Sequence, residues 1–372
     1  TINECFFQIQ NGANIKQGDV EGGFPITRIE TTANDKFNRD RMGYAGITDI
    51  SKYEAYVLED GDLLMSHINS VQYLGRTVLY VKQPDEIIIH GMNLLRLKAR
   101  RNIINPAYAR YCFYGHTFRC QIGNITKKSV NQASFAVKDL KQIKIEVPSL
   151  DVQNKVVVIL DRVQKIIDMR NNELASLDDL IKARFVEMFG SIHESTKYPY
   201  IAVKDLTDIT SGGTPSRDKT EYWDNGTIPW VKTTELQNNV LIDVDEHITE
   251  AGLAGSSAKL VPVGTILVAM YGQGKTRGMT AYLGVEASTN QACACILPSD
   301  KVDSMFMWKY FELSYDKLRS LAQGAGQPNL NGNMIKNFQV LVPPIELQKE
   351  YVDFVHQINK SKVVDIDKKD KL

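Results

Sequence analysis

The stretch that most constrains the fold lies in the middle of the chain, from Pro148 to Gly190. Apolar residues recur there every three or four positions, which lays one apolar stripe along a helix of about 40 residues, about 60 Å long at 1.5 Å per residue. The stripe consists of Val156, Ile159, Val163, Ile166, Leu174, Leu177, Ile181, Phe185 and Met188. A narrow stripe of this length predicts a helix that packs as a coiled coil.

The opening of this helix returns near the end of the chain. Val147–Gln153 reads VPSLDVQ, and Val342–Gln348 reads VPPIELQ. Shorter matches, with gradually drifting spacing, join the sequences that precede the two copies: 24–28 with 228–232, 61–65 with 264–268, and 92–95 with 290–293. The chain is therefore predicted to be a duplication of one unit, a globule followed by a long helix.

The first globule contains short β-rich runs interrupted by Gly, Asn and Asp, with one helical stretch from Pro106 to about Cys120. The predicted strands are 24–29, 62–66, 77–81, 86–89, 93–97 and 143–147. This mixture predicts an α+β domain. The predicted divisions are domain 1 at 1–148, a central helix at 149–190, domain 2 at 191–343 and a distal helix at 344–372. The distal helix has fewer residues than the central one, so a shortened C-terminal end is expected.

Composition excludes several classes of protein. The 372 residues carry 44 basic and 44 acidic side chains, which argues against both a polybasic nucleic-acid binder and an acidic DNA mimic. No apolar run reaches the roughly 18 residues that a membrane span needs. The five cysteines lack metal-ligand spacing, and Cys293 and Cys295 lie in an apolar run typical of a buried strand. A cytoplasmic protein with reduced thiols and no bound metal is expected.

Two motifs that suggest enzymes have simpler structural interpretations. Gly272–Thr276 ends like a phosphate-binding loop, but Ala269 stands where its first glycine belongs, and Met279–Leu283 is predicted to be a strand rather than a helix. Asn105–Tyr108 resembles the Asn-Pro-Pro-Tyr motif of amino-methyltransferases. No glycine-rich cofactor-binding turn precedes it, and proline in the first helical turn is a common start signal. No residue spacing suggests a catalytic centre.

Polar loops at matching places in the two globules are the best candidates for a binding site. Ser211–Arg217 combines glycines with hydroxyl and guanidinium groups suited to phosphates. Tyr271–Arg277 corresponds to Ser66–Gln72, and Gly326–Asn329 corresponds to Asn131–Ser134. Arg, Lys, Asn and Gln are the side chains that read base edges with two hydrogen bonds. Any one of these residues could be an ordinary solvated loop residue, but their coincidence in both repeats favours DNA binding.

The whole chain resembles the specificity (S) subunit of type I restriction-modification systems. The resemblance rests on SGGTPSR at Ser211–Arg217, the GQGKTRG loop at Gly272–Gly278, TNQA at Thr289–Ala292, QPNL at Gln327–Leu330 and VPPIELQ at Val342–Gln348, with Tyr222-Trp223 and Ile228-Pro229-Trp230 between the first two. It is weaker in the first half, where Gln10–Asn14 replaces the SGGTPS signature. The family implies two tandem target-recognition domains, each reading half of a split DNA sequence, held apart by antiparallel helices.

The resemblance also implies partners and the absence of catalysis in this chain. The helices would dock two methyltransferase subunits, and restriction/translocase subunits would join that core. S-adenosylmethionine, ATP and Mg²⁺ would be bound by those partners, with no cofactor bound here. The candidate DNA-binding residues are Lys16, Arg39, Arg41, His67, Asn69, Gln72, Lys127, Lys128, Asn131, Gln132, Thr214, Ser216, Arg217, Lys232, Thr233, Tyr271, Gln273, Lys275, Arg277, Gln327 and Asn329.

Two other functional classes are weighed against this interpretation. A self-contained DNA methyltransferase or endonuclease would need a cofactor-binding fold, for which the sequence has no motif. A coiled-coil scaffold without a DNA role would leave the paired polar loops unexplained. Binding of S-adenosylmethionine by the purified chain would favour the first alternative.

Overall fold

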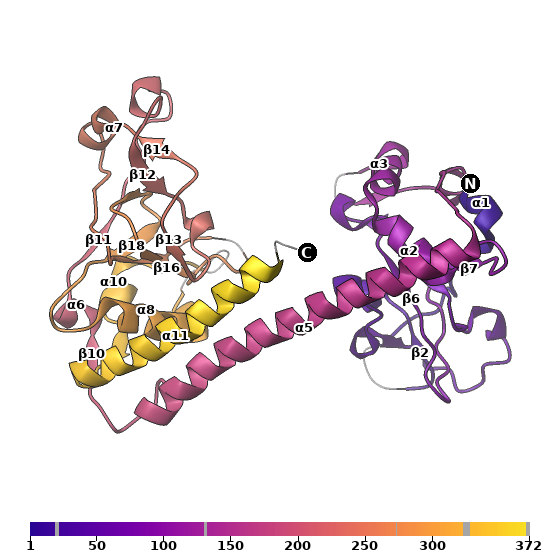
Figure 1. Cartoon of the computed structure of the whole chain (residues 1–372), viewed down its shortest axis with the longest axis horizontal. Coiled ribbons are helices and arrows are strands. Elements are labelled where there is room, and N and C mark those ends of the chain that lie inside the picture. The colour runs from indigo at the N-terminus through magenta and orange to yellow at the C-terminus, as the bar shows by residue number, and fades with distance from the viewer. Residues whose placement is uncertain (19–21, 130–131, 273, 323–327, 370–372) are drawn as a thin grey trace. The chain divides into compact units, whose positions relative to one another are not determined.

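The computed structural model describes residues 1–18, 22–129, 132–272, 274–322 and 328–369 (Figure 1). It divides into two compact units, unit 1 at Thr1–Asp168 and unit 2 at Met169–Leu372. Each unit combines a mainly antiparallel sheet with helices that pack on it, as the α+β prediction requires. The two units are built to the same plan.

The central sheets share one strand order. In unit 1 the order is β1-β7-β4-β6, and in unit 2 it is β11-β18-β15-β16 with β13 added at the edge. The strands of unit 1 are β1 (Phe6–Asn11), β4 (Leu63–Ser66), β6 (Thr77–Leu79) and β7 (Leu94–Ala99), and those of unit 2 are β11 (Ile209–Ser211), β13 (Asn239–Leu241), β15 (Ile266–Ala269), β16 (Thr280–Leu283) and β18 (Cys293–Ile296). The central strands β4, β15 and β18 are buried along their whole length, because both faces of the sheet are covered. Identical order in both sheets confirms the duplication inferred from the sequence.

A helix pair packs on each sheet. Unit 1 has α2 (Pro106–Tyr114) and α3 (His116–Ile125), and unit 2 has α8 (Ser304–Leu313) and α9 (Tyr315–Ser320). The Asn105 side chain accepts from the amide of Ala107 at 2.8 Å, so the Asn105-Pro106 pair is a helix start. The single helix expected from Pro106 to Cys120 is interrupted, because Gly115 has extended backbone angles and separates α2 from α3.

Shorter elements complete each unit. Unit 1 contains α1 (Ile2–Cys5), β2 (Pro25–Ile26), β3 (Gly43–Tyr44), β5 (Ile68–Asn69), β8 (Lys127–Lys128), β9 (Ala133–Ser134), α4 (Val137–Leu140) and the 3-10 segments η1 (Ile29–Asp35), η2 (Arg39–Arg41), η3 (Glu54–Tyr56) and η4 (Val71–Tyr73). Unit 2 contains β10 (Tyr200–Ala202), α6 (Val203–Leu206), η5 (Thr220–Tyr222), β12 (Ile228–Val231), η6 (Thr233–Glu235), β14 (His247–Ile248), α7 (Glu250–Ala254), β17 (Ser288–Thr289), α10 (Gly332–Lys336) and β19 (Gln339–Leu341).

The long helices are α5 (Leu150–Phe189) and α11 (Ile345–Lys369). The predicted apolar stripe of α5 is covered only towards its two ends. Val156 packs on the core of unit 1, whereas Ile181 and Phe185 lie in the core of unit 2. Between them, Ile159 exposes 59% and Val163 exposes 45% of its surface. The stripe therefore extends beyond the surface that this chain itself covers.

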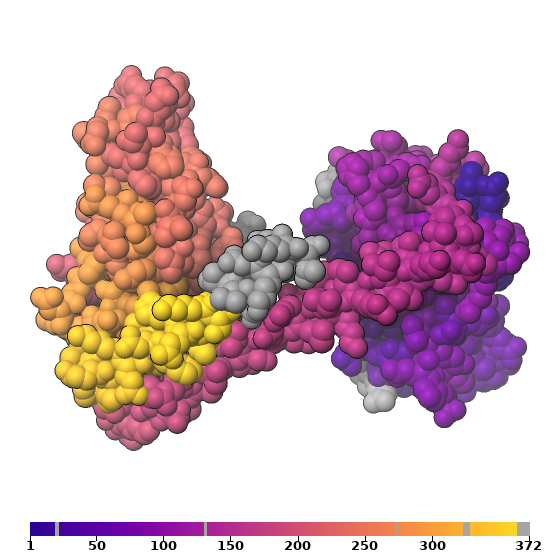
Figure 2. Space-filling model, in the orientation of Figure 1, coloured from indigo at the N-terminus to yellow at the C-terminus, as the bar shows by residue number. Residues whose placement is uncertain are grey.

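Helix α11 runs back along the end of α5 within unit 2, and the two helices lie side by side in the space-filling view (Figure 2). The Arg184 guanidinium pairs with Glu350 at 2.8 Å, and the Tyr351 hydroxyl donates to the Ile181 carbonyl at 3.3 Å. Further along, Lys362 pairs with Asp178. Along these contacts the residue numbers of α5 decrease while those of α11 increase. The two helices are therefore antiparallel, as predicted.

One buried glutamine in each repeat joins a long helix to its globule. The Gln153 side-chain oxygen accepts from the Asn105 amide at 2.8 Å, and its nitrogen donates to the Pro148 carbonyl at 2.8 Å. Gln348 repeats both contacts, accepting from Asp303 at 2.8 Å and donating to Pro343 at 2.7 Å. The two glutamines are 0% and 1% exposed. This shared bonding explains why the VPxxxxQ sequence recurs.

Two predicted strands of unit 1 are wrong. Residues 86–89 form only isolated bridges at Ile89, with Ile26 and Val57. Residues 143–147 are extended but belong to no strand, although the equivalent residues of unit 2 form β19. The difference has a physical cause, since a strand needs a partner: β19 pairs with β10, and no described strand lies beside 143–147.

The structure describes the cysteines and the helices to which the thiol and membrane predictions apply. Cys293 and Cys295 are buried on β18 and are free thiols, as expected for an apolar strand. Burial raises the pKa of the Cys295 thiol to about 11. Among the helices that the structure describes, none is long and apolar enough to cross a membrane.

We expect Gln348→Leu to lower the free energy of unfolding of unit 2 by about 2 to 4 kcal/mol, because it leaves the buried Asp303 amide and Pro343 carbonyl without partners. Gln357→Leu on the exposed face of α11 is the matched control and should change stability by less than about 0.5 kcal/mol. Calorimetry of the full chain measures both. Equal transition temperatures for the two variants would show that Gln348 is not an anchor.

Candidate nucleic-acid interface

Two of the predicted loops of unit 2 and the segment before β18 meet at one end of its central sheet. β15 ends at Ala269, which is opposite Cys293 at the start of β18, and β11 ends at Ser211, which is opposite Ala294. The segments 212–217, 270–279 and 290–292 therefore leave the sheet at the same end. Antiparallel pairing brings together loops that are far apart in the sequence.

Hydrogen bonds join these loops into one surface. The Gly213 amide donates to the Thr289 carbonyl at 2.9 Å, and the Thr214 hydroxyl donates to the Gln291 side chain. The Met270 amide donates to the Ala292 carbonyl at 2.9 Å. The Leu330 amide donates to the Met270 carbonyl at 3.0 Å, which brings the segment after Gln327 to the same surface.

Two tryptophans shape the Ser211–Arg217 loop. The Trp223 indole donates to the Ser216 carbonyl at 3.0 Å, and the Trp230 indole donates to the Gly213 carbonyl at 3.0 Å. A side chain at Gly213 would place its Cβ 2.2 Å from the Ser257 hydroxyl, so the close approach requires glycine. The hydroxyls of Thr214 and Ser216 remain on exposed residues.

Arg217 and Lys232 share one carboxylate. The Arg217 guanidinium lies 3.6 Å from the Trp223 ring centroid and pairs with Glu246 at 2.6 Å. Lys232 pairs with the other oxygen of Glu246 at 2.9 Å and with Asp245 at 3.5 Å. Burial raises the Glu246 pKa, but the ion pairs with Arg217 and Lys232 outweigh it and hold that pKa below its usual range. Both cations are therefore neutralised in the free protein.

Helix α9 holds the 270–279 loop. The Tyr315 hydroxyl donates to the Lys275 carbonyl at 2.7 Å, and Arg319 donates to the Arg277 carbonyl at 2.8 Å. The Arg277 guanidinium donates to the Pro328 carbonyl, so its role is at least partly structural. Lys275 and Tyr271 are exposed, and Tyr271 shows 43% of its surface. Lys275 is thus an exposed residue on a backbone that α9 holds in place.

Unit 1 gathers several of its candidates on a small sheet. β5, β9 and β8 pair in the order β5-β9-β8, with Asn69 and Lys128 both paired with Ala133. Lys127, Lys128 and Gln132 are exposed, and Asn69 is half-buried. The structure therefore brings together residues from two of the predicted loops, on a sheet that follows β4 as the 270–279 loop follows β15.

Two candidates of unit 1 are less accessible than the sequence predicts. The sequence places His67 on an open loop, but the residue is only 5% exposed, and its ring packs edge-on against Phe135. Burial lowers its pKa, so the ring is neutral and provides no cation for a phosphate. Arg39 pairs with Glu86 at 2.7 Å and also donates to the Val81 carbonyl at 2.9 Å. Glu86 lies in the segment predicted to be a strand, and sequence alone did not reveal this pairing.

The remaining candidates divide by exposure. Lys16, Arg41 and Gln72 are exposed in loops or 3-10 segments of unit 1, whereas Thr233 and Asn329 are half-buried in unit 2. Asn131, Gln273 and Gln327 lie outside the described residues. A contact with DNA stays a prediction for every one of the candidates.

Sequence reasoning missed some residues that build this surface. The predicted loops of unit 2 are held by four residues that lie outside them: Gln291, Glu246, Tyr315 and Arg319. Gln291 and the two tryptophans stand in motifs that carry the family resemblance, which was a usable signal. The roles of Glu246 and Arg319 depend on distant partners and had no sequence signal.

Comparisons with known proteins agree with this architecture. A family model described as the type I restriction modification DNA specificity domain matches the chain twice, at residues 4–179 and 195–371. The chain belongs to this family. Both repeats carry the domain, so the protein is a DNA specificity subunit of a type I restriction-modification system.

Individual relatives carry the same description. A protein of Methanocaldococcus jannaschii, assigned as the MjaX type I restriction enzyme specificity subunit, is 26% identical over 98% of this chain and 86% of its own length. The EcoR124I/EcoR124II specificity subunit of Escherichia coli is 24% identical over 60% of this chain and 57% of its own length. The solved S subunit from M. genitalium is 13% identical, covers 99% of this chain and 90% of its own, and has a TM-score of 0.55, which indicates a shared fold.

We expect Glu246→Gln to loosen the Ser211–Arg217 loop while changing the free energy of unfolding by less than about 1 kcal/mol, because the ion pairs are partly exposed. Folding lowers the Glu246 pKa. The stabilisation that the ionised carboxylate gives to the folded loop is therefore fully present above the usual pKa range of glutamate, and it is lost as pH falls through the lowered pKa. At neutral pH, the amides of residues 213–219 should therefore be less protected from exchange in Glu246→Gln than in the parent. The parent should lose the same protection only at strongly acid pH. Glu250→Gln, exposed on α7, is the control. Unchanged exchange in Glu246→Gln would contradict the role given to this carboxylate.

Proposed function

We propose that this specificity subunit is non-catalytic and reads a split DNA sequence, one half with each unit. The observation that supports this most directly is the repeated placement of polar loops on one strand order: the 270–279 loop follows β15 in unit 2, and the 66–72 segment with β5 follows β4 in unit 1. Duplicated surfaces suit a target with two separate halves. Each half would be read in the major groove, where base edges differ most.

The exposed groups in each unit suggest how contacts divide. Lys275 of unit 2 and Lys127 and Lys128 of unit 1 have the charge for phosphates, which position the protein without reading sequence. Thr214 and the exposed amide Gln132 have the hydrogen-bonding groups for base edges. Arg217, Lys232 and Arg39 are all paired to carboxylates and so are not free for phosphates, and we therefore expect the isolated chain to bind DNA weakly without partners.

The long helices would dock the partners. The uncovered stripe on α5, which includes Ile159 and Val163, is the kind of apolar face that a partner helix covers. We assign it to methyltransferase subunits, through which restriction/translocase subunits would join. S-adenosylmethionine, ATP and Mg²⁺ would then be bound by those subunits, and the reactions would be theirs.

Modular recognition is the first test of the proposal. Replacing residues 191–343 with the equivalent domain of another family member should change one half of the methylated sequence and leave the other half unchanged, because each unit has its own core and loops. Mapping of methylated adenines in cells that carry the hybrid and its partner subunits is the measurement. The reciprocal exchange of residues 1–148 is the control and should alter only the other half. A change in both halves from one exchange would rule out independent readers.

A charge-removal pair tests the loop surface. Lys275→Ala should weaken binding of the assembled complex to all DNA sequences alike and reduce the slope of log affinity against log salt by about 1, as expected for one lost phosphate contact. Lys301→Ala removes the same charge beyond the other end of β18, where Lys301 donates to the Asp205 carbonyl, and should leave the slope unchanged. Binding measured over a salt series distinguishes them. Equal slopes would place the DNA elsewhere.

The helix would act as a ruler between the two half-sites. Four residues inserted at Asn171–Glu173 lengthen α5 by about 6 Å and rotate the C-terminal part of the helix by about 40°. B-DNA advances about 3.4 Å and turns about 35° per base pair. We therefore expect one or two more unread base pairs with both half-sequences unchanged. The insertion precedes Asp178, Ile181 and Arg184, so the described contacts with α11 are retained.

Methylation mapping of cells with the insertion measures the spacing. The control is a substitution of Asn171 and Asn172 by alanine, which keeps the helix length and should keep the original spacing. An active complex that carries the insertion but retains the original spacing would show that α5 serves only for docking.

A further inference from the structure

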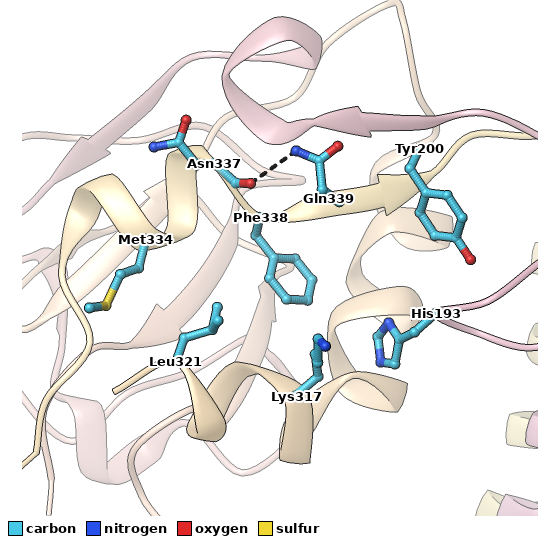
Figure 3. Close-up of a pocket in the computed structure, with 8 residues that line it drawn as sticks. All are labelled: His193, Tyr200, Lys317, Leu321, Met334, Asn337, Phe338 and Gln339. Atoms are coloured by element: carbon cyan, nitrogen blue, oxygen red, sulfur yellow. Dashed lines mark hydrogen bonds between the residues drawn. The ribbon is translucent and has the colours of Figure 1, made fainter. Parts of the chain in front are cut away.

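Unit 2 contains a hollow of about 580 Å³ on its surface (Figure 3). A hollow of this volume is within the usual range of sites that bind small molecules. None of the eight residues drawn there carries a negative charge. They come from β10 and the segment before it, from α9, from α10 and from the chain around β19: His193, Tyr200, Lys317, Leu321, Met334, Asn337, Phe338 and Gln339.

The centre of the hollow is apolar. Figure 3 shows Phe338 between Met334 and Leu321 on one side and His193 and Tyr200 on the other. Phe338 is only 5% exposed, because its ring belongs to the core of unit 2. Met334, Leu321 and Tyr200 are partly buried and pack against the same core. The hollow can therefore surround an apolar group on several sides.

The wall that carries His193 is held by two tyrosine hydroxyls. The Tyr200 hydroxyl accepts from the Ser195 amide at 3.0 Å and donates to the Ile192 carbonyl at 3.2 Å. The Tyr310 hydroxyl donates to the same carbonyl at 3.0 Å and lies 3.4 Å from His193 Nδ1. This wall is thus preformed, and a preformed site loses little conformational freedom when a ligand binds.

Lys317 gives the hollow its positive charge. In the part of the chain that the structure describes, no carboxylate pairs with the Lys317 ammonium. Burial lowers the pKa of His193, and the charge of Lys317 lowers it further, so that charge acts on the wall of the hollow. Glu194 opposes this effect on the His193 pKa but is not one of the lining residues. The Lys317 ammonium is therefore available to an anion.

The hollow and the 270–279 loop lie on opposite faces of α9. Tyr315 and Arg319 are four residues apart and hold that loop. Lys317 stands midway between them in sequence, about 200° around the helix from Tyr315, and Leu321 follows four residues later. The hollow is therefore separate from the loops assigned to DNA.

We propose that this hollow binds a small organic anion that joins an aromatic ring to one carboxylate. The ring packs on Phe338, beside the rings of Tyr200 and His193, since aromatic contacts add to the free energy of apolar burial. The carboxylate pairs with the Lys317 ammonium, which is the one full charge among the eight lining residues at neutral pH. A second negative charge on the ligand would meet no lining cation. The proposal does not depend on the assignment of the loops to DNA.

A pair of matched probes tests the ligand class. The probe is 1-naphthaleneacetate, and its control is 1-naphthaleneacetamide, which has the same ring system and no charge. Titration calorimetry of the full chain at neutral pH measures the affinity for each. The acetate should bind saturably and the amide about three- to fivefold more weakly, as expected for one solvent-exposed ion pair. Equal affinities, or no saturable binding of the acetate at millimolar concentration, would overturn the proposal.

Variants of the full chain locate the probe. Lys317→Met keeps the length of the side chain but removes the charge, so the acetate should lose its advantage over the amide. Lys349→Met, exposed on α11, is the matched control and should retain that advantage. Leu321→Trp fills part of the hollow and should abolish binding of both probes while the chain keeps the transition temperature of the parent to within a few degrees.

Three further outcomes would overturn the proposal. An advantage of the acetate that persists in Lys317→Met would show that another cation meets the carboxylate. Binding that Leu321→Trp leaves unchanged would place the probe outside the hollow. Loss of probe binding when the full chain assembles with its partner subunits would show that the hollow is a docking site for a partner rather than for a small molecule.

Discussion

The buried glutamine at the start of each long helix is the contact on which the rest of this structure depends. Gln153 and Gln348 each tie a helix to the N-cap of the α2 or α8 helix of their own unit, and each also closes its own first turn. An amide side chain supplies a donor and an acceptor from one rigid plane, so it fixes direction as well as position. An apolar residue there could fill space but would leave buried peptide groups unpaired.

That anchor gives each sheet a fixed relation to its own helix, and the strand order then decides where the loops lie. In unit 1 the ends of β1 and β4 lie beside the start of β7, and in unit 2 the ends of β11 and β15 lie beside the start of β18, so the loops at these points share one end of each sheet. The loops themselves are irregular in sequence. Their positions are held by groups behind them, such as Trp230 under Gly213 and Tyr315 under the Lys275 backbone. Rigid support beneath variable loops is a common arrangement for recognition surfaces.

Charge on the candidate surface is controlled by pairing more than by composition. Glu246 neutralises Arg217 and Lys232, and Glu86 neutralises Arg39, whereas Lys275 is left exposed. Cations that are already paired with carboxylates attract DNA weakly at long range. Such pairing favours contacts that form only when a matching partner replaces the carboxylate, which suits a reader that acts within a larger complex.

Sequence by itself determined the duplication, the long helix, the helix start at Pro106 and the burial of Cys293 and Cys295, because these features depend on local periodicity or on residues close in the chain. It also identified the family through short motifs. It could not show that His67 is buried, that Arg39 pairs with Glu86, or that residues 86–89 form isolated bridges instead of a strand. Those outcomes depend on which distant groups meet. Only the tertiary structure decides them, because the free energy of a charge, an amide or a strand edge is set by its partner and its burial rather than by its neighbours in sequence.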